Sequence, residues 1–439
     1  MERKMLCEDM LLEILSWLPI KSLMRFMCVS KHLQSLILHP RFVTMHLENS
    51  RKKTSFLSSY SNEGKSSSYV FPSTIGSLVE EDSEEPYIDS DSVHESDSER
   101  KKYRVLGSCN GLVCLTNGEE QGSITFDFWN PATTEIYENP HSPLKLDEKE
   151  YAAMLGFGYD NSTHTYKLVV IVGPQNFEEY QAFRSIIFSM NEEIRWREIE
   201  EFPADPTTVE GDGIYIYNSL NWLGIYYTEY DEDGTDIPFD YVAIVSLDLE
   251  TETYTEMLLP DQLHGVFVGN FCFPGEQLHC NEAPLIGVLN GCLSLFLHNR
   301  NTKYLSIWQM KEFGNQRSWT LLLNTSLQDL GFCTRRVPTN FSYDYHLWRV
   351  SIGRNQHFCC SYSIFIPLCI IENDREIVIL HNSFQGCVVQ TIIYNLIEKR
   401  VTYRTMCDNL RWIYPMDYVE SLVSPELLPK EPNGTVSLQ

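Results

Sequence analysis

The sequence predicts a mainly β protein that begins with a small all-α module of three helices and continues as a β-propeller. Three observations support this fold class. The first 50 of the 439 residues are rich in apolar residues at helical spacing, the chain from about residue 103 consists of short alternating strands, and one strand-turn-strand unit recurs along that second region.

Helical spacing is clear in the N-terminal segment. Asp9 is the expected N-cap of a first helix, and apolar residues from Leu11 to Leu18 follow it at steps of three and four residues. Pro19 ends this helix, because its ring fits poorly inside one. A second helix and a third follow, and Pro40 ends the third. Three short helices are therefore expected.

The apolar content of this segment exceeds what so small a unit can bury. Of the 43 residues from Met5 to Leu47, 25 are apolar, whereas the apolar share of the whole chain is 43%. A chain of fewer than about 50 residues makes a poor independent core. The excess surface either docks on a partner protein or packs on the rest of this chain, and the pattern alone leaves both alternatives open.

A family resemblance favours the partner. The residues that carry it are Leu6, Glu8-Asp9, Leu18-Pro19, Lys21-Ser22-Leu23, Arg25-Phe26 and Cys28-Val29-Ser30-Lys31. In this order they resemble the F-box, the module by which substrate receptors of ubiquitin ligases hold the Skp-type adaptor of a Skp-cullin-F-box complex. The resemblance implies a Skp-type adaptor as partner, and a cullin through it. The residues expected to contact the adaptor, several of which also form the module's own core, are Leu6, Leu11, Leu12, Ile14, Leu15, Leu18, Pro19, Leu23, Phe26 and Val29.

Composition divides the rest of the chain. Ser, Glu and Asp dominate after the helical module, and ten acidic residues with no Lys or Arg lie from Glu80 to Glu99. Such a segment buries too little apolar surface to fold, so disorder is expected. The expected domains are a helical module at 1–50, a strand-poor linker with the acidic disordered tract at 51–102, a β-domain at 103–425 and a C-terminal tail at 426–439.

The repeated unit of the β-domain consists of an apolar strand, a polar turn and a strand with a central aromatic residue. Its five copies span Phe126–Tyr137, Ile186–Trp196, Val245–Tyr254, Leu305–Trp319 and Ile392–Tyr403. Their spacing suits four-stranded blades, and radial stacking of such blades covers both faces of every sheet. A β-sandwich is the alternative, but it would not require a repeated unit.

Several landmarks of the β-domain are similar to those of the plant F-box-associated domain, which occurs in F-box/kelch-repeat and S-locus F-box-like proteins. They are Gly107–Leu115, Trp129–Thr134, Leu155–Asp160, Ile307–Lys311 and Tyr418–Leu422. The resemblance implies a kelch-like β-propeller over 103–425. It also implies a receptor that binds a target protein and promotes its ubiquitination.

Glycine positions predict where the chain turns or packs closely. The dipeptides at 110–111 and 290–291 are Asn-Gly, the strongest short signal for a hairpin turn with positive φ. Gly156 and Gly158 are expected at a turn or at a close approach between backbones.

No catalytic or cofactor-binding motif stands out in the sequence. It lacks a phosphate-binding loop with Lys, a His-Glu-x-x-His pair and a Gly-x-Ser-x-Gly elbow. The acidic run from Glu229 to Asp240 departs from a calcium loop at its first and last ligands, and Cys359-Cys360 on a strand would point to opposite faces. A non-catalytic receptor with no cofactor and no metal is therefore expected.

Charge and cysteine usage restrict the partners and the location. A formal net charge of -26 makes nucleic acid a poor partner and favours a basic target protein. Thirteen cysteines without a Cys-x-x-Cys pair and an N-terminus without the features of a signal peptide predict a reduced protein in the cytoplasm, the nucleus or both. No apolar run is long enough for a membrane helix, so no membrane partner is expected.

Two other functions stay open on the sequence. The chain could hold the adaptor as a scaffold outside any ligase, or the β-domain could be a propeller enzyme or a carbohydrate-binding module. Adaptor binding without cullin would identify the scaffold, and turnover by residues 103–439 would identify the enzyme. The identity of the target is not encoded in any pattern, because the loops that would select it are the least regular parts of the chain.

Overall fold

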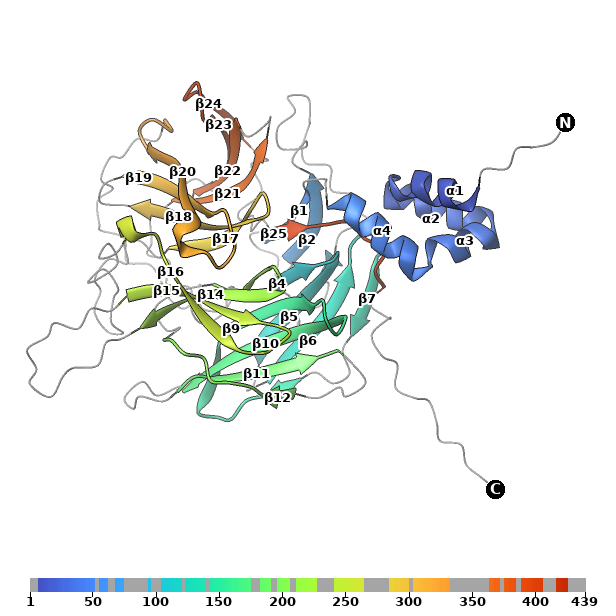
Figure 1. The fold of residues 1–439 in the computed structure, drawn as a ribbon, viewed down its shortest axis with the longest axis horizontal. Coiled ribbons are helices and arrows are strands. Elements are labelled where there is room, and N and C mark those ends of the chain that lie inside the picture. Colours follow the sequence, from blue (N-terminus) through green and yellow to red (C-terminus); the bar gives the residue numbers. More distant parts are fainter. Residues whose placement is uncertain are drawn as a thin grey trace, which may run out of the picture.

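The computed structural model places the helices beside a set of antiparallel sheets, with helix α4 nearest to them (Figure 1). The residues that the structure describes are 7–51, 55–61, 68–74, 94–95, 104–120, 123–138, 143–174, 182–190, 196–205, 211–226, 241–263, 284–299, 303–331, 363–371, 375–383, 388–405 and 416–424.

The described part of the N-terminal module contains four helices, one more than the sequence predicts. They are α1 (Glu8–Ser16), α2 (Ile20–Val29), α3 (Lys31–Ile37) and α4 (Pro40–Ser50). Helix α3 ends at Ile37, before His39-Pro40, as the sequence predicts, but Pro40 also begins α4, where its missing N–H has no helical partner to lose. Asp9 is not the N-cap; α1 begins at Glu8, so the Asp9 carboxylate lies in the first turn, where the helix dipole favours it. None of the described helices is long and apolar enough to cross a membrane.

Six antiparallel sheets follow within the described segments. Sheet 1 contains β25 (Met416–Tyr418), β1 (Ser55–Ser61), β2 (Ser68–Thr74) and β3 (His94–Glu95). Sheet 2 contains β4 (Arg104–Cys109), β5 (Leu112–Glu120), β6 (Ser123–Asn130), β7 (Glu135–Glu138) and β8 (Leu144–Lys145). Sheet 3 contains β9 (Glu150–Asp160), β10 (Thr165–Pro174), β11 (Arg184–Ser189) and β12 (Trp196–Glu198).

The remaining sheets repeat the same four-stranded order. Sheet 4 contains β13 (Ile214–Ile216), β14 (Ser219–Tyr226), β15 (Tyr241–Asp248) and β16 (Tyr254–Leu258). Sheet 5 contains β17 (Leu285–Leu289), β18 (Cys292–Asn299), β19 (Tyr304–Met310) and β20 (Trp319–Ser326). Sheet 6 contains β21 (Ser363–Ile371), β22 (Glu376–Ser383), β23 (Val388–Asn395) and β24 (Val401–Thr405). Within the described segments, the short 3-10 helices Asp261–Leu263 and Gln316–Ser318 lie between strands.

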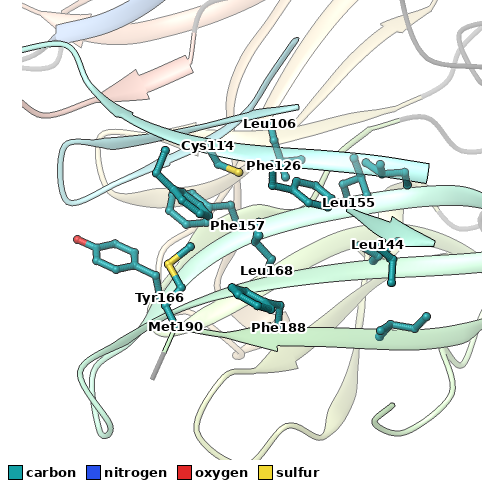
Figure 2. Close-up of a cluster of buried hydrophobic side chains, with 14 of the residues drawn as sticks. Leu106, Cys114, Phe126, Leu144, Leu155, Phe157, Tyr166, Leu168, Phe188 and Met190 are labelled. Carbon is teal, nitrogen blue, oxygen red and sulfur yellow. The ribbon is translucent and has the colours of Figure 1, made fainter. Parts of the chain in front are cut away.

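The sheets are arranged as the blades of a propeller, as predicted. The first strands of successive sheets lie side by side: β4 lies next to β9, β9 next to β13, β13 next to β17 and β17 next to β21, and β25 of sheet 1 lies next to β4. Buried apolar side chains fill the space between neighbouring sheets. Figure 2 shows the cluster between sheets 2 and 3, where Phe126 of β6, Phe157 of β9 and Phe188 of β11 are all almost fully buried. The packing of one sheet on the next therefore forms the core.

The five repeated units are confirmed as the outer two strands of sheets 2 to 6. They are β6–β7, β11–β12, β15–β16, β19–β20 and β23–β24. In three of these hairpins, Asn130, Asp248 or Asn395 begins the turn, and its side-chain oxygen accepts hydrogen bonds from the backbone N–H groups two and three residues later. The residue four positions later has a positive φ in each case. The polar turn of the repeat is thus a side-chain-stabilised turn.

The prediction of a strand-poor linker over residues 51–102 is wrong. Strands β1 and β2 form a hairpin within that range, and β25 pairs with β1 so that Ser55 lies opposite Tyr418. The Ser-rich composition of these strands resembles that of a linker. Their pairing with a strand at the other end of the chain cannot be recognised from the local sequence. The β-domain therefore starts at Ser55, and the two ends of the chain complete sheet 1 together. Of the acidic tract from Glu80 to Glu99, only residues 94–95 lie within the described segments.

The expectations for the glycines are confirmed. The Asn-Gly turns at 110–111 and 290–291 connect the first two strands of sheets 2 and 5, and all four residues have positive φ. A Cβ on Gly156 would lie 2.7 Å from the ring of Trp222, and Gly158 is similarly confined. Side chains of sheet 4 therefore pack too closely on β9 for any side chain at these two positions.

Candidate protein-docking surface

Helix α1 exposes an apolar stripe. Met10, Ile14 and Trp17 lie four and three residues apart on one side of the helix, and 55%, 50% and 49% of their surfaces are exposed. Leu15, the neighbour of Ile14, instead points into the core of the module and is buried. Full burial of a large apolar side chain is worth about 1.5 to 3 kcal/mol. Much of that free energy is still available at the exposed stripe for binding a partner.

The next two helices add further exposed apolar residues. Phe26 and Val29 of α2 are 39% and 73% exposed, and Leu38 at the end of α3 is 54% exposed. Leu23 and Ile37 on the same two helices are fully buried, so each helix has an inner and an outer apolar side. We refer to Met10, Ile14, Trp17, Phe26, Val29 and Leu38 together as the apolar surface of the module.

No sheet of the described residues has as many exposed large apolar side chains as these three helices. Among all described residues, twelve large apolar side chains are exposed, and six of these form the apolar surface of the module. The other six are spread over sheets 2, 4, 5 and 6, and they are Ile136, Tyr217, Tyr304, Leu321, Ile397 and Tyr403. Scattered apolar residues are normal on any protein, whereas a concentration on three short helices is typical of a protein-binding site.

The segment of the module that contains α2 and α3 is positively charged, unlike the whole chain. Lys21, Arg25 and Lys31 are exposed on α2 and α3, and the sequence has no Asp or Glu between Glu13 and Glu48. The whole chain has a formal net charge of -26. On α2 and α3 the apolar surface is therefore bordered by positive charge, which complements a partner surface that is apolar and acidic, whereas α1 carries the exposed Glu8, Asp9 and Glu13.

The residues that the sequence predicted for this site fall into three groups. The exposed residues are Ile14, Pro19, Phe26 and Val29; the half-buried ones are Leu11, Leu12 and Leu18; and Leu15 and Leu23 are buried in the core of the module. Leu6 lies outside the described residues. The sequence analysis missed Met10, Trp17 and Leu38, although the positions four before and three after Ile14 would have identified the first two.

Helix α4 supports α1 at its C-terminal end. The carbonyl oxygen of Leu18 accepts a 2.9 Å hydrogen bond from Nε2 of His46, and the side-chain amide of Asn49 donates a 2.9 Å hydrogen bond to the hydroxyl of Ser16. His46 and Ser16 are both buried. These contacts fix the direction of α1 and leave the side that bears Met10 and Ile14 exposed.

The described part of the β-domain contains a buried ionic cluster between sheets 3 and 4. Nζ of Lys167 lies 2.9 Å from the carboxylates of Asp160 and Glu252. Burial by itself would raise the pKa of Asp160, but hydrogen bonds from Thr163, Lys167 and Ser162 hold this pKa well below its usual range. Asp160 therefore stays ionised at neutral pH, and the cluster joins two sheets instead of providing a proton donor.

The residues that the structure describes contain no group of three potential metal ligands. The acidic run from Glu229 to Asp240 and the Cys359-Cys360 pair lie outside them. Burial raises the pKa of the Cys109 thiol well above its usual range, and the charge of Arg51 and a hydrogen bond with Tyr215 oppose this shift only in part. This thiol therefore stays protonated and is a poor nucleophile.

Comparison with known proteins gives two family matches that together cover most of the chain. The F-box domain matches residues 4–44, and the F-box associated beta propeller domain matches residues 68–425. The F-box/kelch-repeat protein At3g23880 of Arabidopsis thaliana is 30% identical over 72% of this chain and 78% of its own length. The F-box protein CPR1 of Arabidopsis thaliana is 26% identical over 71% of each chain. The F-box protein At5g07610 of the same plant is 22% identical over 91% of this chain and 85% of its own length.

Among solved structures, a Synechocystis apocarotenoid oxygenase variant overlaps with a TM-score of 0.37 at 8% identity, over 72% of this chain and 64% of the oxygenase. This score is below the level at which a shared fold follows.

Proposed function

Because the chain belongs to the family of F-box proteins with an F-box associated β-propeller domain, we propose that it is the substrate-recognition subunit of a Skp-cullin-F-box ubiquitin ligase. The helical module holds the Skp-type adaptor, and the cullin through it, while the propeller holds a target protein. The observation that carries this proposal is the concentration of exposed apolar residues on α1, α2 and α3.

The apolar and basic side chains that the module exposes would fit a docking site on the adaptor that is apolar and acidic. Ile14, Phe26 and Val29 supply apolar contacts, and the exposed Arg25 and Lys31 border them with positive charge. Apolar contacts give most of the affinity in such an interface, while charges at its rim speed association and select the partner. Leu15 and Leu23 contribute indirectly, because they hold the helices that present the contact residues.

The role of this chain in ubiquitin transfer is proximity. A receptor that holds a target beside a charged ubiquitin-conjugating enzyme raises the effective concentration of target lysines, and it needs no reactive side chain of its own. The buried, ionised Asp160 and the protonated thiol of Cys109 are consistent with this non-catalytic role.

The proposals for the charge of the target and for the location of the complex rest on composition alone. A formal net charge of -26 favours a basic target, because electrostatic attraction speeds encounter with a partner of opposite charge. The cysteine pattern favours a reducing compartment, so we place the complex in the cytoplasm, the nucleus or both.

Co-purification tests the assignment. We expect Ile14→Asp combined with Val29→Asp to remove both the Skp-type adaptor and the cullin from the purified complex, because both side chains are exposed and Asp adds a charge to an apolar contact. Ile397→Asp is the matched control, since Ile397 is 68% exposed on sheet 6. Leu15→Asp is unsuitable, because Leu15 is 4% exposed and a charge there would unfold the module.

Three outcomes of that experiment would contradict parts of the proposal. Retention of the adaptor by the double variant would reject the docking surface. Adaptor without cullin in the wild-type complex would identify a scaffold outside the ligase. Loss of the adaptor from the Ile397→Asp control as well would show that the effect is not specific to the module.

A further inference from the structure

The chain segment that follows β25 enters the core of the helical module. We call residues 419–424 the C-terminal strap. Leu422 of the strap is 5% exposed and belongs to the same buried cluster as Leu15, Leu23 and Phe42. Leu422, which lies near the C-terminal end of the sequence, therefore completes the core that the helices of the module form.

Asn130, at the end of β6, holds the strap in place. Its side-chain amide donates hydrogen bonds to the carbonyl oxygens of Ser421, at 2.9 Å, and Val423, at 2.7 Å. Its side-chain oxygen accepts a 2.9 Å hydrogen bond from the backbone N–H of Ala132, which itself packs against the buried cluster of the module. Asn130 is completely buried, so loss of these bonds would leave several polar groups of the strap without partners.

Two further contacts close the junction from the side of sheet 2. A Cβ on Gly111 would lie 2.7 Å from the carbonyl oxygen of Val419, so the β4–β5 turn touches the strap directly. The guanidinium of Arg51, just after α4, donates a 2.6 Å hydrogen bond to the side-chain oxygen of Asn110 in the same turn. The strap and the end of α4 are therefore fixed to one hairpin turn of the propeller.

The covalent path of the chain brings the same two parts together. Helix α4 ends at Ser50, and β1 begins at Ser55. Strand β25, which pairs with β1, leads at Tyr418 directly into the strap. Tyr418 is buried in the cluster formed by Leu57, Val113, Leu115 and Trp129, between sheets 1 and 2. A change that loosens β25 in sheet 1 would consequently withdraw Leu422 from the module.

We propose that the C-terminal strap makes closure of the propeller and orientation of the helical module a single cooperative unit, with Leu422 and Asn130 as its positioning residues. The consequence for ubiquitin transfer rests on the proposed function: the adaptor surface would be held at a fixed distance and angle from the target on the propeller. Two tethered domains with a free linker would instead sample many distances.

Hydrogen–deuterium exchange of the full chain, without adaptor, tests this coupling through Tyr418→Ala. Tyr418 belongs to the buried cluster of the propeller and not to that of the module, yet its truncation is expected to speed amide exchange in α4 by about tenfold or more, because the strap loosens with β25. Tyr394→Ala is the matched control. Tyr394 is equally buried, 5% against 2% for Tyr418, but it packs in the cluster between sheets 5 and 6. Its truncation should speed exchange near sheet 6 and leave α4 unchanged.

Two milder variants keep the test decisive if Tyr418→Ala unfolds the whole propeller. Asn130→Ala should speed exchange in both the strap and α4, and Leu422→Ala should do the same while sheet 1 keeps its protection. Unchanged α4 exchange in the folded Tyr418→Ala protein would overturn the proposal, and so would unchanged α4 exchange in both milder variants. Equal acceleration of α4 by Tyr394→Ala would also overturn it, since the coupling would then not run through the strap. No adaptor is present in these measurements, so their outcome is independent of the adaptor assignment.

Discussion

At the scale of single residues, the ionic cluster between sheets 3 and 4 carries a clear pH dependence. Lys167 is 5% exposed at its side chain and contacts Asp160 and Glu252 on different sheets. Hydrogen bonding lowers the pKa of Asp160 in the folded protein below its ordinary value, so the unfolded chain binds more protons in mildly acidic solution. The resulting stabilisation is complete at neutral pH and is lost as pH falls below about 4 towards the folded pKa.

Asp160→Asn tests this account with almost no change of shape. We expect the free energy of unfolding at neutral pH to fall by about 3 kcal/mol, because removal of one partner leaves a buried charge less well compensated. Denaturant unfolding measures the loss, and the gap between wild type and variant should narrow in acid. Glu198→Gln is the control, since Glu198 pairs with Arg184 at an exposed site and should cost under about 1 kcal/mol. A gap that stays constant or widens in acid would contradict the low pKa of Asp160.

The turn at Gly111 gives a second prediction at this scale. Gly111 and Gly291 occupy equivalent Asn-Gly turns with φ of 84° and 72°, so Ala at either position carries a similar left-handed strain of about 1 to 2 kcal/mol. A Cβ on Gly111 would also clash with Ser421 and Val419 of the strap, whereas nothing lies within 4 Å of one on Gly291. We expect Gly111→Ala to lower the melting temperature by several degrees more than Gly291→Ala. An equal decrease in melting temperature for Gly111→Ala and Gly291→Ala would show that the strap does not touch this turn.

Sequence periodicity identified the module but could not separate its core from its surface. Leu15 and Ile14 are neighbours on α1, both are apolar, and both fit a helical stripe. Which of them is buried depends on where α4 and Leu422 lie, and no local pattern contains that information. Trp17 is a different case, because it lies three residues after Ile14 and half of its surface is exposed, so the helical spacing would have identified it.

At the scale of elements, helix α3 depends on its cap. It spans only Lys31–Ile37, a length at which a helix is marginal without support. The hydroxyl of Ser30 accepts hydrogen bonds from the backbone N–H groups of His32, at 3.1 Å, and Leu33, at 3.2 Å. The cap therefore satisfies two of the N–H groups that a helix leaves unpaired at its start.

Ser30→Ala is expected to destabilise α3 by about 1 kcal/mol, the usual contribution of a serine cap. Hydrogen–deuterium exchange of the peptide that covers α3 should become several-fold faster as a result. Ser35→Ala, on the exposed side of the same helix, provides the control and should leave exchange unchanged or slower. Unchanged exchange in Ser30→Ala would show that packing alone holds α3.

Elements were predictable from the sequence where their signals were local. The alternating strands and turns of sheets 2 to 6 follow one another along the chain, so the five repeated hairpins could be recognised. Sheet 1 combines β1 and β2 with β25 from the other end of the chain, and the Ser-rich β1 lacks a clear apolar alternation. Pro40 misled the helix assignment because proline both ends one helix and begins another.

At the scale of the whole molecule, the arrangement separates the helical module, which bears the proposed adaptor surface, from the propeller, which is proposed to hold the target. The four helices stand to one side of the propeller, with α4 and the C-terminal strap at the junction (Figure 1). The six residues of the apolar surface on α1 to α3 stay exposed in this arrangement, and α4 is the helix nearest to the sheets. The helical module and most of the propeller could be predicted from the sequence, but their rigid junction could not, because it joins Asn130, Arg51 and Leu422 from three distant parts of the chain.

The most direct test of the central claim is the dissociation constant of the purified full chain with a purified Skp-type adaptor. Ile14→Asp combined with Val29→Asp should weaken binding by at least about 100-fold, since two apolar contacts of about 1.5 to 3 kcal/mol each are lost. Ile397→Asp should leave the constant unchanged, and all three proteins should melt at similar temperatures. Wild-type affinity in the folded double variant would contradict the claim that the exposed apolar residues of the helical module form the adaptor-binding surface.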